Sequence, residues 1–474
     1  MKHLSAATTQ RIFRYARRGA LLLALGAAGP AAWGQSFGPA MIYTSGSASF
    51  PNGVAVGDVT GDGRPDIVTA NYVANMVGVL PGLASGGFGA MTTFGTGGGP
   101  NDLVLGDVNG DGRLDVVTAN STSSSVTVLL GLAGGFANRV SYSAGPTSRP
   151  VRAVLGDVNG DGRLDIATAN YGSGTAGLLL GLATGGFGPV TTYLTSSISR
   201  AVALGDVNGD SRLDLVAANY GLSSAGIFLG LASGGFGPAS TYSTGPNSEP
   251  DGMVLGDVNG DGRLDIVTAN TLTFAAGVLL GQAGGSFAPA ASYSLGAGSA
   301  PIAVALGDVN GDGRRDIVAA IYNRPTAVVL LGQVTGGFSP ATAYTVGPDE
   351  PQAVAVADVN SDGRPDIVTA NGSANTVSVL LNTGTYTPLA TARPTATAEI
   401  TMAPNPAHEA FTVQLPTGLV PTQAELLNAL GQVVRRPAVG RPSFRVETSG
   451  LAPGLYTLRL LAGGTALARR VVVE

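Results

Sequence analysis

The chain has 474 residues, including 72 glycines and 28 prolines, and a formal net charge of −5 at pH 7. Because 44% of the residues are hydrophobic and only 12% are charged, a disordered chain is excluded, and short strands joined by Gly-rich turns explain the composition better. The lack of cysteine excludes a disulfide framework and a cysteine nucleophile, and two histidines at opposite ends, His3 and His408, disfavour a Ser-His-Asp or multi-histidine site.

Residues 1–34 are predicted to be a secretory signal peptide. Four arginines between positions 11 and 18 precede an apolar run at 19–28, and small residues precede the expected cleavage after Gly34. The alternative is an ordinary amphipathic first helix. The apolar run is too short to span a bilayer and no later stretch reaches about 18 apolar residues, so no transmembrane segment is expected in the mature chain.

Residues 35–386 contain a repeat with two markers. The string Gly-Asp-Val-Asn-Gly-Asp-Gly-Arg-Leu-Asp, or a close variant, has its first Asp at positions 58, 107, 157, 206, 257, 308 and 358, so the period is 49 to 51 residues. An aromatic marker such as Phe-Gly-Pro-Ala has its Phe at positions 37, 88, 136, 187, 236, 287 and 338. We expect these phenylalanines to pack between neighbouring repeats.

Each repeat reads as four short strands, which the second repeat shows at 103–105, 115–119, 126–130 and 136–142. Four strands in about 50 residues are typical of a propeller blade, so the predicted fold is all-β, a seven-bladed β-propeller. No aromatic marker follows the last Asp string. Segment 37–43 is therefore expected to supply the outer strand of the last blade and to remove an exposed sheet edge.

The composition changes after the seventh repeat. Residues 387–397 are rich in Thr, Pro and Ala and are predicted to be a linker. Residues 398–474 alternate apolar and polar residues, with strands expected at 411–415, 424–427, 432–434, 456–460 and 471–473. They are predicted to form a small C-terminal β-sandwich.

The Asp strings have the pattern of a calcium loop. Counting from the first Asp, oxygen-bearing side chains stand at positions 1, 3, 5 and 9, position 7 is an arginine whose backbone carbonyl can bind metal, and position 6 is usually a glycine that permits a sharp turn. Oxygen ligands in a flexible loop suit calcium better than magnesium or a transition metal. The arginine side chain is expected to point outward. A metal-free turn is the alternative.

Up to one calcium ion per blade is therefore expected, in a structural role. Loop one has Thr60 in place of Asn, and loop four has Ser211 in place of the turn glycine, so these two sites are expected to be weaker. The predicted metal-binding residues are Asp58, Thr60, Asp62, Arg64, Asp66, Asp107, Asn109, Asp111, Arg113, Asp115, Asp157, Asn159, Asp161, Arg163, Asp165, Asp206, Asn208, Asp210, Arg212, Asp214, Asp257, Asn259, Asp261, Arg263, Asp265, Asp308, Asn310, Asp312, Arg314, Asp316, Asp358, Asn360, Asp362, Arg364 and Asp366.

The seven Asp strings, with the Phe-Gly pairs at 37–38, 88–89, 187–188 and 236–237, resemble the FG-GAP and VCBS repeats of integrin α-subunit propellers and of secreted bacterial proteins. The Phe marker departs from the strict pair at 136–137, 287–288 and 338–339. The resemblance implies a seven-bladed propeller with calcium in the loop between the first two strands of a blade. It does not specify a ligand.

Residues 398–474 resemble the C-terminal sorting domain of the type IX secretion system of Bacteroidota. The matching motifs are at 404–407, 431–434, 450–456 and 469–473. The resemblance implies contact with the secretion machinery and passage across the outer membrane, followed by release or surface attachment. An accessory Ig-like domain is the alternative.

The rim opposite the Asp strings is the expected place for a partner. It carries Tyr72, Tyr171, Tyr220 and Tyr322, each beside an asparagine. These side chains could bind a sugar, or they could serve only strand ends and blade packing. The acids of residues 35–386 outside the Asp strings are Asp102, Glu249, Asp251, Asp349 and Glu350, near Arg149, Arg152 and Arg200. A carboxylate pair there could hydrolyse glycosides, or the charges could simply be solvated.

The expected function is that of a secreted or cell-surface calcium-binding propeller that acts in adhesion or binds a glycan or protein and has no catalytic residues. The alternatives are a polysaccharide lyase or glycosidase and a passive surface scaffold. Without residues 1–34 the chain has 21 arginines, no lysine and 31 acids, a net charge of −10, so a nucleic-acid partner is not expected.

Overall fold

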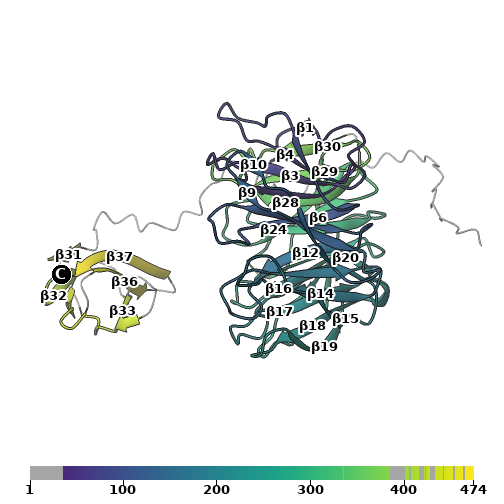
Figure 1. The fold of residues 1–474 in the computed structure, drawn as a ribbon. Helices are drawn as coiled ribbons and strands as arrows, with labels where there is room; N and C mark the ends of the chain where they lie inside the picture. The colour runs from purple at the N-terminus through teal and green to yellow at the C-terminus, as the bar shows by residue number, and fades with distance from the viewer. Residues whose placement is uncertain are drawn as a thin grey trace, which may run out of the picture. The chain divides into compact units, whose positions relative to one another are not determined.

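The computed structural model describes residues 36–384 except 335 and 348, and residues 401–473 except 405, 406, 416–420, 422, 428–432, 441, 452, 453, 463 and 464. The chain divides into two compact units, Met1–Tyr386 and Thr387–Glu474 (Figure 1). The predicted signal peptide at 1–34 and linker at 387–397 lie outside the described residues. In the described ranges there is no α-helix, and hence no helix able to cross a membrane.

The first unit is built from seven antiparallel sheets of four strands each, which are the blades of a β-propeller. The innermost strands are β2 (Pro51–Gly57), β6 (Pro100–Gly106), β12 (Pro150–Gly156), β16 (Ser199–Gly205), β20 (Pro250–Gly256), β24 (Pro301–Gly307) and β28 (Pro351–Ala357). The second strands are β3 (Asp66–Asn71), β7 (Asp115–Asn120), β13 (Asp165–Asn170), β17 (Asp214–Asn219), β21 (Asp265–Asn270), β25 (Asp316–Ile321) and β29 (Asp366–Asn371).

The other two strands of each blade lie further from the axis. The third strands are β4 (Met76–Leu80), β8 (Ser125–Leu129), β14 (Thr175–Leu179), β18 (Ser224–Gly230), β22 (Ala275–Leu279), β26 (Thr326–Leu330) and β30 (Thr376–Leu380). The outer strands are β5 (Thr92–Gly95), β11 (Val140–Ser143), β15 (Thr191–Leu194), β19 (Phe236–Ser243), β23 (Ala291–Ser294), β27 (Thr342–Thr345) and β1 (Met41–Thr44). The short elements are β9 (Gly131–Leu132), β10 (Gly135–Phe136) and the 3-10 turn η1 (Tyr220–Leu222).

The ring of blades is closed by both ends of the repeat region. Each innermost strand contacts the innermost strand of the next blade, and β28 contacts β2. In the seventh blade, β1 pairs with β30 from Met41 opposite Val379 to Thr44 opposite Thr376. The N-terminal strand therefore covers an edge that would otherwise be free to pair with another chain.

The hydrophobic core lies between the blades. All six residues of every second strand are buried, because both faces of each sheet are covered by neighbouring blades. Six-residue runs such as Asp-Ile-Val-Thr-Ala-Asn suit this position, since their β-branched side chains fill a pleated, fully buried surface.

The Phe marker packs between blades, as expected. Seven edge-to-face pairs run around the ring, each joining a marker phenylalanine to an aromatic side chain of the preceding blade, with ring centroids 5.0–5.4 Å apart. The single outer strand predicted at 136–142 is wrong, because β10 ends at Phe136 and β11 begins at Val140. Phe136 packs against Phe94 of the first blade, and the chain pairs with β8 as a ladder only from Val140.

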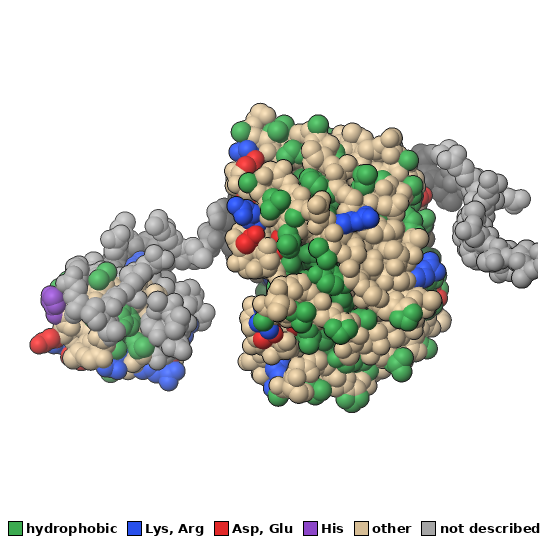
Figure 2. Space-filling view, viewed as in Figure 1, with side chains coloured by type: hydrophobic (Ala, Val, Ile, Leu, Met, Phe, Trp, Pro, Cys, Tyr) green, Lys and Arg blue, Asp and Glu red, His purple; other side chains and the backbone are tan. Residues whose placement is uncertain are grey.

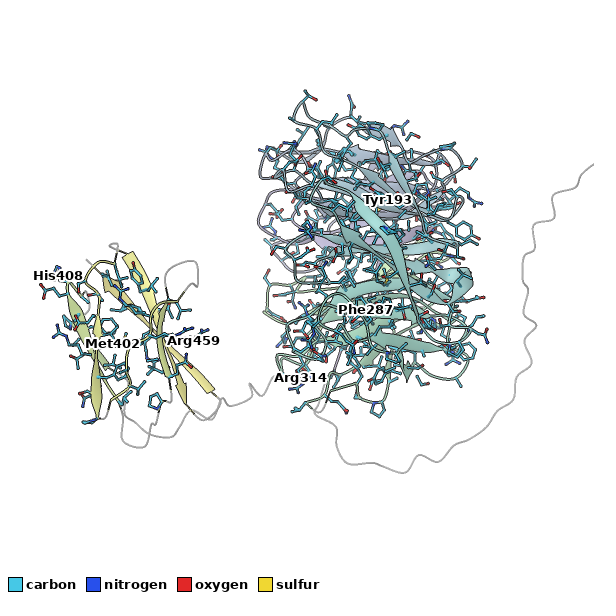
Figure 3. The ribbon with its side chains drawn as sticks, turned by 90° about the horizontal axis from the view of Figure 1, so that it is seen from below. Tyr193, Phe287, Arg314, Met402, His408 and Arg459 are labelled. Carbon is cyan, nitrogen blue, oxygen red and sulfur yellow. The ribbon has the colours of Figure 1, made fainter. Side chains whose placement is uncertain are left out.

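Replacing Phe287 by leucine is expected to destabilise the propeller by about 1–2 kcal/mol. Phe287 is 6% exposed, lies inside the propeller (Figure 3) and meets Tyr242 edge to face at 5.4 Å. Leucine keeps most of the buried volume but loses the aromatic contact, which contributes about 0.5–1.5 kcal/mol. Urea unfolding measures the change. Val334→Ala at an 83% exposed site is the control and should leave the midpoint unchanged; equal midpoints for both variants would contradict the role of the pair.

The second unit is a β-sandwich. One sheet contains β31 (Thr401–Ala403), β32 (Ala410–Gln414) and β35 (Ser443–Glu447), and the other contains β33 (Gln423–Leu427), β34 (Val433–Arg435), β36 (Gly454–Ala462) and β37 (Thr465–Val473). Both sheets contribute to one core, which includes Phe411, Leu426 and Val446. Buried Glu425 accepts hydrogen bonds from Arg459 and Arg436, so its charge is compensated.

Candidate functional site

The seven Asp strings form equivalent loops that join the innermost strand to the second strand of each blade. We call them the Asp loops; they are residues 58–66, 107–115, 157–165, 206–214, 257–265, 308–316 and 358–366. Since neighbouring strands are antiparallel, the Asp loops lie at one end of the propeller. The opposite end, which we call the open rim, carries the loops between second and third strands and those that join blades. Red and blue atoms adjoin at several points along the edge near β9 and β10 (Figures 1 and 2).

The first aspartate holds each loop in its turn. In loop two, one carboxylate oxygen of Asp107 accepts the N–H groups of Gly110 and Asp111 at 2.7 and 3.0 Å, and the other accepts that of Gly112 at 2.7 Å. The glycine at position 6 has φ near +84°, a conformation that L-residues rarely adopt. In loop four Ser211 takes that conformation, with φ of 67°, and still donates to Asp206 at 2.7 Å. The backbone of Ser211 is therefore strained, while the turn is kept.

Positions 3, 5 and 7 interact with one another. In loop three the Asn159 amide donates to Asp161 at 2.9 Å, and the backbone N–H of Arg163 donates to the same carboxylate at 3.0 Å. The Arg163 guanidinium also pairs with Asp161. Six loops have this arginine pair, and Arg314 of loop six lies at the periphery of the propeller (Figure 3).

The prediction that the position-7 arginines point outward is therefore wrong for these six loops. Each guanidinium turns back onto the aspartate two residues earlier, and in five loops its Nε donates to a carbonyl after the third strand. The physical reason is charge: three aspartates in one loop repel one another, and the arginine compensates part of that repulsion. In loop two, no Arg113–Asp111 ion pair occurs among the described residues. The hydrogen bonds from the Arg113 N–H and the Asn109 amide, with a smaller contribution from the Arg113 charge, hold the pKa of Asp111 below its usual range.

The ninth aspartate is buried and connects two backbone segments through hydrogen bonds. In loop six both oxygens of fully buried Asp316 accept backbone N–H groups, from Val309 at 2.8 Å and from Gly332 at 2.7 Å. The same two bonds recur in the other loops, tying the Asp loop to the end of the third strand. Burial raises the pKa of Asp316 to about 7 and that of Asp366 to about 6.

The residue types of the Asp loops fit a hard cation, whereas the loops as described are held by their own hydrogen bonds. Carboxylate, amide and backbone oxygens are the ligands that calcium prefers. In loop one the buried hydroxyl of Thr60 has no hydrogen-bond partner among the described residues, so an acceptor at position 3 is available there. No group of three or more His, Cys, Asp or Glu side chains in the described ranges is arranged to hold a metal ion. In the six loops with the arginine pair, calcium would have to displace the arginine from position 5.

The asparagines of the open rim are structural. Asn120 is fully buried, accepts a bond from Thr118 at 2.9 Å and donates to Thr127 at 2.8 Å. The equivalent asparagines of the first, third, fourth, fifth and seventh blades are at most 1% exposed. Asn120, Asn170, Asn219 and Asn371 hydrogen-bond to Ser or Thr side chains of their own blades, whereas the side-chain oxygens of Asn71 and Asn219 have no partner among the described residues. Tyr322 is 45% exposed, whereas Tyr72, Tyr171 and Tyr220 are half-buried.

Two tyrosines of the open rim are engaged by arginines. The Arg200 guanidinium lies over the rings of Tyr171 and Tyr220, 4.9 and 4.8 Å from their centroids, and Arg149 lies 5.6 Å from Tyr171. Burial, followed by the hydrogen bond to Glu249, raises the pKa of Tyr220. Arg149, Tyr171, Arg200 and Tyr220 therefore form one stack across the third and fourth blades.

The acids of the open rim that approach the axis are paired with arginines. Arg152 Nη1 donates to Asp102 at 3.2 Å, and Arg200 Nη1 lies 3.4 Å from Asp251. Burial raises the pKa of both carboxyl groups, and the arginines oppose this effect. Sequence reasoning placed all four residues on this rim but missed the pairs; the available signal was opposite charges separated by one repeat period.

Comparison with family models assigns both units. The model described as FG-GAP-like repeat matches residues 58–118, 107–168, 157–217, 206–268, 275–319 and 308–369. The chain belongs to the FG-GAP-like repeat family. The model described as secretion system C-terminal sorting domain matches residues 401–474 of this FG-GAP protein. The sorting domain, rather than an accessory Ig-like domain, is thus the identity of the second unit, and it directs export by type IX secretion to the cell surface or the extracellular space.

Solved structures resemble the FG-GAP protein at low identity. BBS1N, crystallised in complex with ARL6DN, is 11% identical, with a TM-score of 0.52 over 73% of this chain and 96% of that one. A lectin from Agrocybe aegerita that recognises non-reducing terminal N-acetylglucosamine is 19% identical, with a TM-score of 0.43 over 62% of this chain and 79% of that one. No curated protein matches the chain.

Proposed function

We propose that this exported FG-GAP protein is a calcium-stabilised propeller that binds an extracellular glycan or protein at its open rim and catalyses no reaction. The observation that carries the proposal is the sevenfold recurrence of oxygen-rich Asp loops in a chain that type IX secretion exports. Calcium outside cells reaches concentrations at which weak sites fill, so loops of modest affinity suffice.

A binding role is supported by the positions at which the seven blades differ from one another. The Asp loops and second strands are nearly identical in every blade, as structure alone requires. On the open rim, in contrast, the innermost strands carry charged residues only in blades two to five, and Asp102 and Asp251 are each held by an arginine. Carboxylates held in this way are placed for hydrogen bonding rather than for attack on a glycosidic bond, which needs two carboxyl groups facing each other.

Retention of the mature chain on insoluble polysaccharides tests the proposal. The protein is incubated with a panel of polymers in calcium and in chelator, at a temperature where circular dichroism shows it folded in both. We expect calcium-dependent retention on at least one polymer and no release of soluble sugar. Sugar release would contradict the noncatalytic role. Retention on no polymer, together with no protein captured from an extracellular extract, would overturn the binding role.

A further inference from the structure

The mouth of the central channel on the open rim departs most from the sevenfold repeat. Each innermost strand has a bulge there, which displaces one residue from the ladder. The seven bulge residues are Asn52, Asn101, Val151, Arg200, Asp251, Ile302 and Gln352. A bulge changes the direction in which neighbouring side chains point. In this propeller, the residues at or just after the bulges are charged only in blades two to five.

A cavity of about 160 Å³ begins at this mouth and is lined by innermost strands of all seven blades. Asp102 and Arg152 are its only charged lining residues among those described, and the rest are small or apolar, such as Ala201 and Val354. The cavity is smaller than sites that enclose drug-sized ligands, which are about 300–1,000 Å³. It therefore admits one ring of a ligand rather than a whole chain.

Arg152 and Arg200 at the mouth are held in place, but not all of their hydrogen-bond donors are used. Arg152 and Arg200 are 23% and 32% exposed, and each gives one nitrogen to a carboxylate. Each guanidinium has five N–H donors, so donors remain for a ligand. Stacking on Tyr171 and Tyr220 holds Arg200 in place before any ligand binds.

Unsatisfied polar atoms also occur at the bulges around the mouth. Among the described residues, three bulge residues have a buried polar atom without a partner, namely the donors Arg200 Nε and Gln352 Nε2 and the acceptor Asn52 Oδ1. Buried polar groups are rarely left unpaired, because the loss of hydration costs free energy. These three residues surround the mouth and do not line the cavity itself, so a group that reaches the mouth meets both unpaired donors and an unpaired acceptor. A hydroxyl group both donates and accepts.

The balanced charges of the residues at the mouth disfavour an ionic ligand. Arg149, Arg152 and Arg200 are balanced by Asp102, Glu249 and Asp251, so the cluster has no formal net charge, and an ion of either sign would face a like charge close by. Three residues directly before an innermost strand also hold a strained backbone: Phe50, Arg149 and Glu249 have φ of 48°, 48° and 47°, at the position where the second blade has Gly99. Strain of this kind is retained where a side chain is needed.

We propose that the channel mouth binds the terminal sugar of an uncharged glycan end-on, with hydroxyl groups placed between Arg152 and Asp102. This rests on the proposed function, since it names the ligand class of the same rim. A protein ligand would instead need a wider contact than one cavity provides.

Titration of the mature protein with neutral methyl glycosides and with linear neutral oligosaccharides of increasing length tests the proposal. Uronic acid glycosides serve as charged comparators. We expect one neutral sugar to bind, chain extension beyond the terminal sugar to leave Kd unchanged, and the matching uronate to bind more weakly. A Kd that falls steadily with chain length would overturn end-on binding, and preference for the uronate would overturn the selection for a neutral sugar.

Variants locate the site. Arg152→Gln and Asp102→Asn are each expected to weaken binding roughly tenfold, as loss of a charge-assisted hydrogen bond does. Ala303→Leu fills the cavity without touching an ion pair and should also abolish binding. Arg324→Gln, on the same rim of blade six, is the control and should bind like the wild type. Melting temperatures show which variants are folded.

Failure of this inference differs from failure of the proposed function. A wild type that binds glycans, with folded Arg152→Gln and Ala303→Leu variants that bind equally well, would overturn the channel-mouth site and leave the binding module intact. A wild type that binds a protein but no neutral sugar would overturn the ligand class alone.

Discussion

Calcium is expected to raise the melting temperature of the chelator-treated propeller more than any other change in conditions. If each Asp loop binds with a Kd near 1 mM, 10 mM calcium stabilises the folded state by about 1.4 kcal/mol per site, or roughly 10 kcal/mol for seven independent sites. Calorimetry with calcium, magnesium and chelator measures the effect. The same melting temperature in calcium and in chelator would contradict calcium binding as a source of stability.

A single loop can be tested with a matched pair of variants. Asp111→Asn removes a carboxylate at position 5 of loop two, where no arginine ion pair occurs in the described residues. The exposed carboxylate accepts hydrogen bonds from the Asn109 amide and the Arg113 N–H, so the chelated variant should melt only slightly below the wild type. In calcium it should bind one ion fewer and gain less stability. Asp349→Asn, which removes an acid outside the Asp loops, is the control and should keep the full calcium stoichiometry. A loss of calcium in both variants would point to surface charge rather than to a defined site.

The propeller and its repeat could be predicted from sequence because the constraint is repeated seven times. A turn glycine, a buried ninth aspartate and a Phe marker recur at one spacing, and each repeat must satisfy the same contacts between blades. The pairing of β1 with β30 was also foreseeable, since segment 37–43 had no other blade to join. A single short strand is difficult to assign from its sequence, but seven copies of the same pattern at one spacing make the assignment secure.

The arginine contacts could not be predicted from the sequence, because each arginine has several possible acidic partners and only the folded chain selects one of them. The position-7 arginine has no fixed direction in the sequence, and the turn toward Asp161 or Asp312 follows from charge compensation inside one loop. In the same way, Arg152 and Asp102 are one blade apart, and the contact between β6 and β12 brings them together at the channel mouth. The ring closes through contacts between innermost strands, whose alignment the spacing alone does not specify.

The ninth aspartate is expected to be the largest single contributor to the stability of an Asp loop, with or without metal. Asp316→Ala removes both acceptors of the Val309 and Gly332 N–H groups and leaves two buried donors unpaired, at a cost of about 1–3 kcal/mol each and roughly 2–6 kcal/mol together. Urea unfolding in chelator, where no ion contributes, measures the loss. Asp316→Asn keeps one acceptor oxygen and should lose less.

The matched control is Asp312→Ala, the same chemical change four residues earlier in the same loop. Asp312 pairs with Arg314 at a partly exposed position, and such pairs contribute at most about 1 kcal/mol. The two variants should therefore separate by several kcal/mol in chelator, because one leaves buried N–H groups unpaired and the other leaves groups that water can reach. If Asp316→Ala and Asp312→Ala unfold at the same urea concentration, the buried carboxylate does not tie the Asp loop to the third strand, and the metal alone would have to order these loops.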